Sequence, residues 1–153
     1  NREAREAMML AATQGGMAFA NASVTLIHGM SRPVGALFHV PHGLSNAMLL
    51  PEITAWSVGA AQGRYADCAR QMAFAAPTDS DTVAVGKLVD GLRQLCADLS
   101  VPGPADYGIS ESDWFDALPT MAEQALASGS PANNPRIPEA RDIVALYERV
   151  WAG

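Results

Sequence analysis

The sequence predicts an all-α protein with five to seven helices in a single domain that covers residues 1–153. Apolar residues recur at spacings of three and four in several segments, and no segment alternates apolar and polar residues over a useful length. Of the 153 residues, 49% are hydrophobic and 17% are charged, which is enough apolar surface for a substantial core. No segment is repeated.

The first expected helix covers residues 2–27, where alanine and methionine are frequent. Gly15 and Gly16 are expected to weaken or bend it, because glycine has the lowest helix propensity after proline. A second helix is expected over residues 42–58. Pro51 lies inside its pattern and predicts a kink or a restart, because proline removes a backbone donor.

Four more helices are expected after this point. A short one covers residues 64–74, and the segment 79–99 gives the clearest helical pattern, with one apolar face expected in the core (Val85, Leu88, Leu92, Leu95 and Leu99). Ser110 is expected to cap a helix over residues 111–126. The last helix, 138–151, is amphipathic.

Charge and cysteine content exclude several classes of protein. The formal net charge is -6 and no basic cluster occurs, which argues against nucleic acid or an anionic membrane as the partner. No apolar run reaches the roughly 20 residues of a membrane-spanning helix. Cys68 and Cys96 lie far apart and suggest neither a disulfide nor a thiolate metal site, so a cytoplasmic location is expected. The chain begins with Asn1 and shows no signal peptide, and we expect it to be a piece of a longer protein.

All three histidines of the chain lie within fifteen positions, at His28, His39 and His42. A neutral imidazole binds transition metals and exchanges protons near neutral pH. His28 and His42 are not spaced as neighbours on one helix, so they meet only if the intervening chain turns back. Pro33 and Pro41, with the glycines that follow each, are expected to redirect the backbone twice. Two roles fit this pattern: the histidines bind a metal, or they are core or surface histidines with hydrogen-bonded ring nitrogens. The second role stays open because no nearby carboxylate completes a metal site.

The segment HGMSRPVGALFHVPHGLSNAMLLP, residues 28–51, resembles the signature of the iron-containing alcohol dehydrogenases, in the dehydroquinate synthase-like superfamily. The shared pattern is a histidine, a stretch with proline and glycine, then Pro-His-Gly and an apolar run that ends in Leu-Pro. The resemblance extends to both sides of this segment. It includes NREAREAMMLAATQGGMAFANA, VPGPADYGISESD and NNPRIPEARDIVALYERVW, which together span essentially the whole chain.

The resemblance implies a two-domain protein of which this chain is the helical, metal-binding C-terminal domain. An N-terminal nucleotide-binding domain that takes NAD or NADP is expected in the intact protein. The family binds a divalent metal, usually iron (Fe²⁺) and sometimes zinc (Zn²⁺), with one aspartate and three histidines. The last two histidines map onto His28 and His42, and the other two ligands are expected upstream of Asn1. The implied reaction is hydride transfer between an alcohol or aldehyde and a nicotinamide, with the metal as Lewis acid.

Three more residues are candidates near the metal. Arg32 stands where the family often has histidine, and a guanidinium cannot act as a base at neutral pH. It is expected either to contact an anionic substrate group or cofactor phosphate, or to make a surface ion pair. His39 is not a ligand position in the family. It is expected either to line the pocket or donate a hydrogen bond there, or to have a structural role. Phe19 matches an aromatic position of the family's substrate pocket, although an apolar helix residue is a core residue by default.

The segment 133–136 (Asn-Asn-Pro-Arg) resembles a late active-site loop of the family, and it is equally well read as a connection between two helices. Two functions remain open for the chain as a whole. The first is the metal-binding half of an alcohol dehydrogenase, inactive as an isolated fragment. The second is a non-catalytic helical domain that packs against a partner, such as the absent N-terminal domain, or against a second copy of itself.

Overall fold

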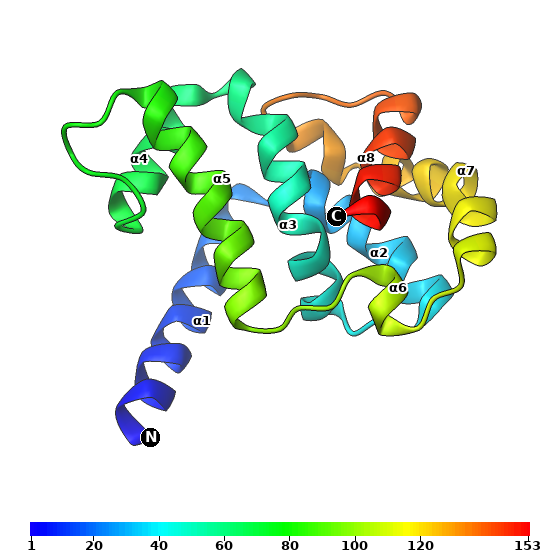
Figure 1. Ribbon diagram of the computed structural model, residues 1–153, viewed down its shortest axis with the longest axis horizontal. Coiled ribbons are helices and arrows are strands. Elements are labelled where there is room, and N and C mark those ends of the chain that lie inside the picture. The colour runs from blue at the N-terminus through cyan, green and yellow to red at the C-terminus, as the bar shows by residue number, and fades with distance from the viewer.

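The computed structural model describes residues 1–153 and is entirely helical, as predicted (Figure 1). It has eight α-helices and two short 3₁₀ turns: α1 (Arg2–Ala22), α2 (Leu26–Phe38), α3 (His42–Ser57), η1 (Val58–Ala60), α4 (Gln62–Gln71), α5 (Asp81–Asp98), α6 (Pro104–Tyr107), α7 (Glu111–Ala127), η2 (Ser130–Asn133) and α8 (Ala140–Ala152). The number exceeds the expected five to seven because α2 and the four-residue α6 were not anticipated.

The helices form two packed groups, and α3 lies between them (Figure 1). The larger core joins α2, α3, α7 and α8. At its centre the indole of Trp114 donates to the Tyr147 carbonyl at 3.3 Å, and the Tyr147 hydroxyl donates to the Met30 carbonyl at 2.6 Å. Both aromatic side chains are buried with their polar groups satisfied, so α7 and α8 are fixed against α2.

The first expected helix, 2–27, is two helices in the structure. α1 ends at Ala22, and Ser23 has φ +64°, after which α2 begins at Leu26. Leu26, Met30 and Val34 are buried at helical spacing, so α2 continues through its internal proline. Burial of this face outweighs the backbone bond that the proline removes.

The smaller core joins α4 and α5 and corrects the expected apolar stripe of 79–99. Leu88 and Leu92 are buried in it, whereas Leu95 is 41% exposed and Leu99 is 68% exposed. The stripe is therefore core only in its first part, because the smaller core ends at Leu92.

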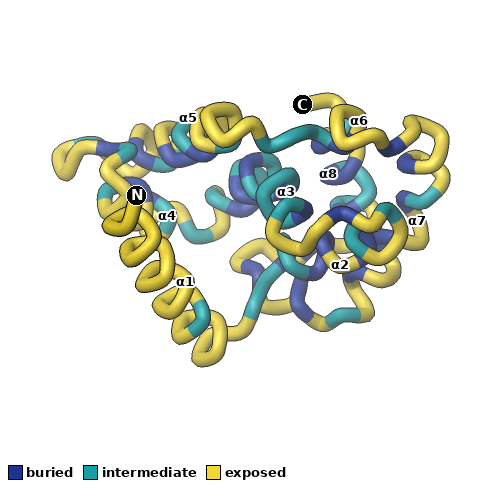
Figure 2. Tube along the Cα trace, turned by 90° about the horizontal axis from the view of Figure 1, so that it is seen from below, coloured by how far each residue is buried: buried dark blue, intermediate teal, exposed yellow.

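α1 lies apart from both cores. None of its residues is buried, and Figure 2 shows it exposed along nearly its whole length. Five large apolar side chains project from it: Met8, Met9, Leu10, Met17 and Phe19. No helix of the chain is long and apolar enough to cross a membrane. Both cysteines are free thiols.

Candidate metal centre

The turn between α2 and α3 brings His28 and His42 together. His39 ends α2 in the left-handed conformation, with φ 56° and ψ 26°, and the chain reverses there. Val40 is buried and runs back along α2, so that a Cβ on Gly35 would stand only 3.2 Å from its carbonyl oxygen. α3 then begins at His42, next to the first turn of α2. The glycine of the signature is thus explained by a close approach of two backbone segments.

The two imidazole rings have centroids 5.1 Å apart and planes inclined at 57°. Metal–nitrogen bonds to imidazole of about 2.0–2.1 Å put each ring centroid roughly 3.2 Å from the metal, and two such rings at a tetrahedral angle roughly 5.2 Å apart. The observed separation therefore fits two ligands of one metal ion. Each ring comes from a different helix, as the sequence spacing required.

The surroundings of His28 favour its neutral form. Partial burial lowers the pKa of His28 below its ordinary value of 6.5, and the neighbouring His42 and Arg32 lower it further. A neutral imidazole keeps the lone pair that a metal needs, whereas an imidazolium has none. Arg32 is exposed and follows His28 by one turn of α2, so its positive charge acts on His28 through electrostatic repulsion.

Asn46 contacts His42 from the next turn of α3. Its Nδ2 atom donates to the His42 carbonyl at 2.7 Å and lies 3.4 Å from Nδ1 and 3.3 Å from Nε2 of the ring. No sequence motif marked this residue as part of a site. Its position four residues after His42 on the same helix is the signal that could have found it.

The structure does not bring His39 and Phe19 into this cluster. His39 is exposed, makes no ring pair with the other two histidines, and its carbonyl accepts a bond from the Tyr107 hydroxyl at 3.2 Å. His39 therefore has a structural role in this chain: it ends α2 and lets the backbone reverse direction. Phe19 is 58% exposed on α1 and lines none of the four main hollows of the chain.

The segment 133–136 connects helices in this structure. Asn133 donates to the Val24 carbonyl at 3.0 Å, before α2, and Asn134 donates to the Ser57 hydroxyl at 3.0 Å, at the end of α3. The Arg136 guanidinium lies 4.0 Å from the ring centre of Trp56. These bonds hold the first turn of α2 and the last turn of α3 in place.

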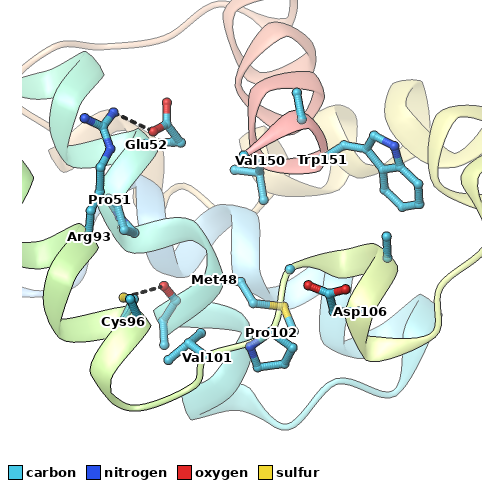
Figure 3. A pocket seen from close by; sticks show the side chains of 16 residues that line it. Met48, Pro51, Glu52, Arg93, Cys96, Val101, Pro102, Asp106, Val150 and Trp151 are labelled. Carbon is cyan, nitrogen blue, oxygen red and sulfur yellow. Dashed lines mark hydrogen bonds and ion pairs between the residues drawn. The ribbon is translucent and has the colours of Figure 1, made fainter.

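No group of three or more histidine, cysteine, aspartate or glutamate side chains comes together in the chain, so His28 and His42 form a pair without a third such side chain. A hollow of about 550 Å³ lies elsewhere, between α3, α5, α6 and the end of α8, and none of the histidines lines it (Figure 3). In it, Arg93 pairs with Glu52 at 2.8 Å, and the Cys96 thiol contacts the Ala47 carbonyl at 3.7 Å. Those polar groups satisfy one another and do not converge on a ligand.

This helical domain places two imidazoles from adjacent helices side by side, and the second of them, His42, belongs to the sequence Pro-His-Gly. The profile described as "Fe-containing alcohol dehydrogenase family, C-terminal" matches residues 1–151. The chain therefore belongs to the iron-containing alcohol dehydrogenase family and corresponds to its C-terminal part.

Individual relatives agree with this assignment. The chain is 34% identical to 1,3-propanediol dehydrogenase of Klebsiella pneumoniae, with 99% of the chain and 38% of the relative covered. It is 33% identical to lactaldehyde reductase of Escherichia coli K12, with 99% and 39% covered. It is 31% identical to NADPH-dependent butanol dehydrogenase of Clostridium saccharobutylicum, with 100% and 39% covered. The chain thus spans about two fifths of the length of these relatives.

Solved structures share the fold. A crystal structure of 1,3-propanediol oxidoreductase superposes with a TM-score of 0.90 at 32% identity, covering 98% of this chain and 38% of that one. The iron-containing alcohol dehydrogenase of Thermococcus thioreducens gives a TM-score of 0.86 at 29% identity, covering 100% and 38%. The helical arrangement of the chain is therefore the one found in the C-terminal part of these enzymes.

Proposed function

We propose that residues 1–153 are the metal-binding domain of an NAD(P)-dependent alcohol dehydrogenase, and that His28 and His42 are two of its metal ligands. The observation that carries this proposal is the ring separation of 5.1 Å between two histidines on different helices. Fe²⁺ is the expected metal because the chain belongs to the iron-containing family, and Zn²⁺ accepts the same imidazole ligands. A cytoplasmic location belongs to this proposal, supported by the two free thiols.

The proposed substrates are small alcohols and aldehydes. The relatives are named for 1,3-propanediol, lactaldehyde and butanol, which share a short chain and one hydroxyl or carbonyl that reacts. NAD or NADP would bind to the rest of the intact protein, since no nucleotide-binding α/β unit occurs among the helices of this chain.

In this reaction the metal would act as a Lewis acid on the substrate oxygen. The chain contributes two imidazoles from adjacent helices, and the lowered pKa of His28 keeps its ring neutral and able to ligate. Arg32 lies on the exposed side of α2, close to His28, where its guanidinium can contact an anionic group of substrate or cofactor. It has no role in proton transfer, because it stays protonated at neutral pH.

The proposal is tested with the full-length protein loaded with Fe²⁺ or Zn²⁺ and assayed for alcohol-dependent reduction of NAD or NADP. We expect turnover with short-chain alcohols and none when the metal is removed by a chelator. The 153-residue chain alone is expected to be inactive, because it supplies two ligands and no nucleotide site. Turnover by the chain alone would contradict the proposal.

A second candidate function is packing against another polypeptide, which α1 favours. Its exposed apolar side chains form a surface of the kind that is normally covered in a protein complex or by another domain. The expected partner is the N-terminal part of the same polypeptide, and self-association of the isolated chain is the competing outcome. Sedimentation of the chain with and without residues 1–22 tests this, and a monomer in both cases would argue against self-association.

A further inference from the structure

We propose that Asn46 is a positioning residue for the metal site, which holds the His42 ring in its ligating orientation while it leaves both ring nitrogens free. This inference rests on the proposed metal site. The inference concerns how the chain holds the His42 ring in position, because the histidine pair by itself contains no group that does so. Three observations on the Asn46 amide support it, and each concerns a different atom or contact.

The first observation fixes the orientation of the amide. Nδ2 of Asn46 lies 2.7 Å from the backbone carbonyl oxygen of His42, which can only accept a hydrogen bond. The NH₂ group must therefore face this carbonyl, and a flipped amide would place two acceptors against each other. The amide is thus anchored on the same residue whose ring it contacts.

The second observation is how the amide meets the ring. Nδ2 is almost equally far from the two ring nitrogens, at 3.4 Å from Nδ1 and 3.3 Å from Nε2. A donor aimed at one in-plane lone pair would lie much closer to one nitrogen than to the other. The NH₂ group instead faces the ring as a whole, in a weak N–H···π contact, so neither lone pair is used up. One nitrogen stays available for a metal and the other for its proton.

The third observation is the cost that this arrangement carries. Oδ1 of Asn46 is buried and has no hydrogen-bond partner. Unpaired buried polar atoms are rare, and asparagine is a poor residue for a helix interior. For the stability of α3 alone an alanine would serve better, which points to a role at the histidine pair.

The competing explanation is that Asn46 only bonds its own helix backbone. The chain offers a matched control for this, because Asn21 donates to the Met17 carbonyl at the same distance of 2.7 Å, on α1 and away from the histidines. Thr13 donates to the Met9 carbonyl at 2.9 Å, so a threonine also makes this bond at the fourth position. Asn46→Thr should therefore keep the backbone bond and lose the contact with the ring.

The test measures metal affinity of the full-length protein by competition with a chelator, using Co²⁺, whose visible absorption also reports ligand geometry. Asn46→Ala and Asn46→Thr are both expected to weaken Co²⁺ binding by about 10- to 100-fold and to alter its absorption, as loss of a residue that orients a ligand typically does. Asn21→Ala is expected to bind as the wild type does. Far-UV circular dichroism of the metal-free proteins checks that the helices are intact.

The variants His28→Ala and His42→Ala distinguish a failure of the proposed metal site from a failure of the proposed role of Asn46. In His42→Ala protein, adding Asn46→Ala should cause no further loss, because the two residues act on the same ligand. If the His28→Ala and His42→Ala variants keep wild-type affinity, the proposed metal site is wrong, and this inference with it. If those variants lose metal while Asn46→Thr binds as tightly as the wild type, the site stands and the role of Asn46 at the ring is refuted.

Discussion

Gly29 packs against the segment after α7, and replacing it with alanine should destabilise the larger core. A Cβ at this position would lie 2.9 Å from Cγ and from Cδ of Pro131 and 3.3 Å from the Ser128 hydroxyl oxygen. Carbon atoms pack at about 3.5–4.0 Å, so these distances are too short. Pro131 is buried and its ring cannot swing aside. We therefore place the cost in the upper part of the range for overpacking, about 2–3 kcal/mol.

The gain in helix propensity from glycine to alanine offsets roughly 0.5–1 kcal/mol of that cost. We expect Gly29→Ala to lower the free energy of unfolding by about 1–2.5 kcal/mol, measured by urea unfolding of the chain and followed by tryptophan fluorescence. Gly86→Ala is the matched control, because Gly86 lies inside α5 and nothing would come within 4 Å of its Cβ. It should raise stability by roughly 0.5–1 kcal/mol. Adding Pro131→Ala to Gly29→Ala should recover part of the loss. If Gly29→Ala stabilised the chain as Gly86→Ala does, the packing of η2 on α2 would be wrong.

Three further outcomes are expected. Tyr147→Phe should lower the free energy of unfolding by about 1–1.5 kcal/mol, because it removes the buried donor to an α2 carbonyl; an unchanged urea midpoint would contradict this. Arg32→Ala should raise the pKa of His28 slightly, since Arg32 is the smallest of three causes that lower it; histidine NMR titration measures this, and a fall in pKa would disagree. The pKa of His28 in the folded chain lies below the 6.5 of the unfolded chain, so protons bind the unfolded state more readily. The metal-free protein should therefore lose stability as the pH falls through 6.5. His28→Gln should make this loss smaller, and an unaltered pH dependence of stability would contradict the prediction.

The helix ends with local signals could be predicted from the sequence. Ser110 caps α7, where its hydroxyl accepts from the Asp113 amide at 3.1 Å, and the expected start at residue 111 is confirmed. Ser80 caps α5 in the same way. In both cases a short polar side chain satisfies a free amide of the first turn, so the signal lies within four residues and needs no knowledge of the rest of the fold.

The features that depend on distant parts of the chain could not be predicted. Pro33 indicates a break by local rules, yet it lies inside α2, because the buried face of that helix packs against α3 and α7. Leu95 and Leu99 continue a helical stripe, but the smaller core ends before them. Sequence periodicity shows which face of a helix is apolar, and only tertiary packing decides how much of it is covered.

The histidine pair lies between these cases. The concentration of three histidines and the resemblance of residues 28–51 singled out His28 and His42, and the structure places their rings 5.1 Å apart. Asn46 could not be predicted from the sequence, because its proposed role depends on the orientation of its amide against the His42 ring, and no spacing rule encodes this orientation. The close approach of Val40 to Gly35 is likewise visible only once the chain has turned back along α2.

The most direct test of the metal site is the metal content of the full-length protein and its single variants, measured by elemental analysis after purification in the presence of Fe²⁺. The wild type is expected to hold one metal ion per chain, and His28→Ala and His42→Ala are each expected to lose it. His39→Ala is the matched control, because His39 lies in the same segment but outside the pair, and it should keep its metal. Metal retained at the wild-type level in either His28→Ala or His42→Ala would contradict the assignment of these two residues as ligands.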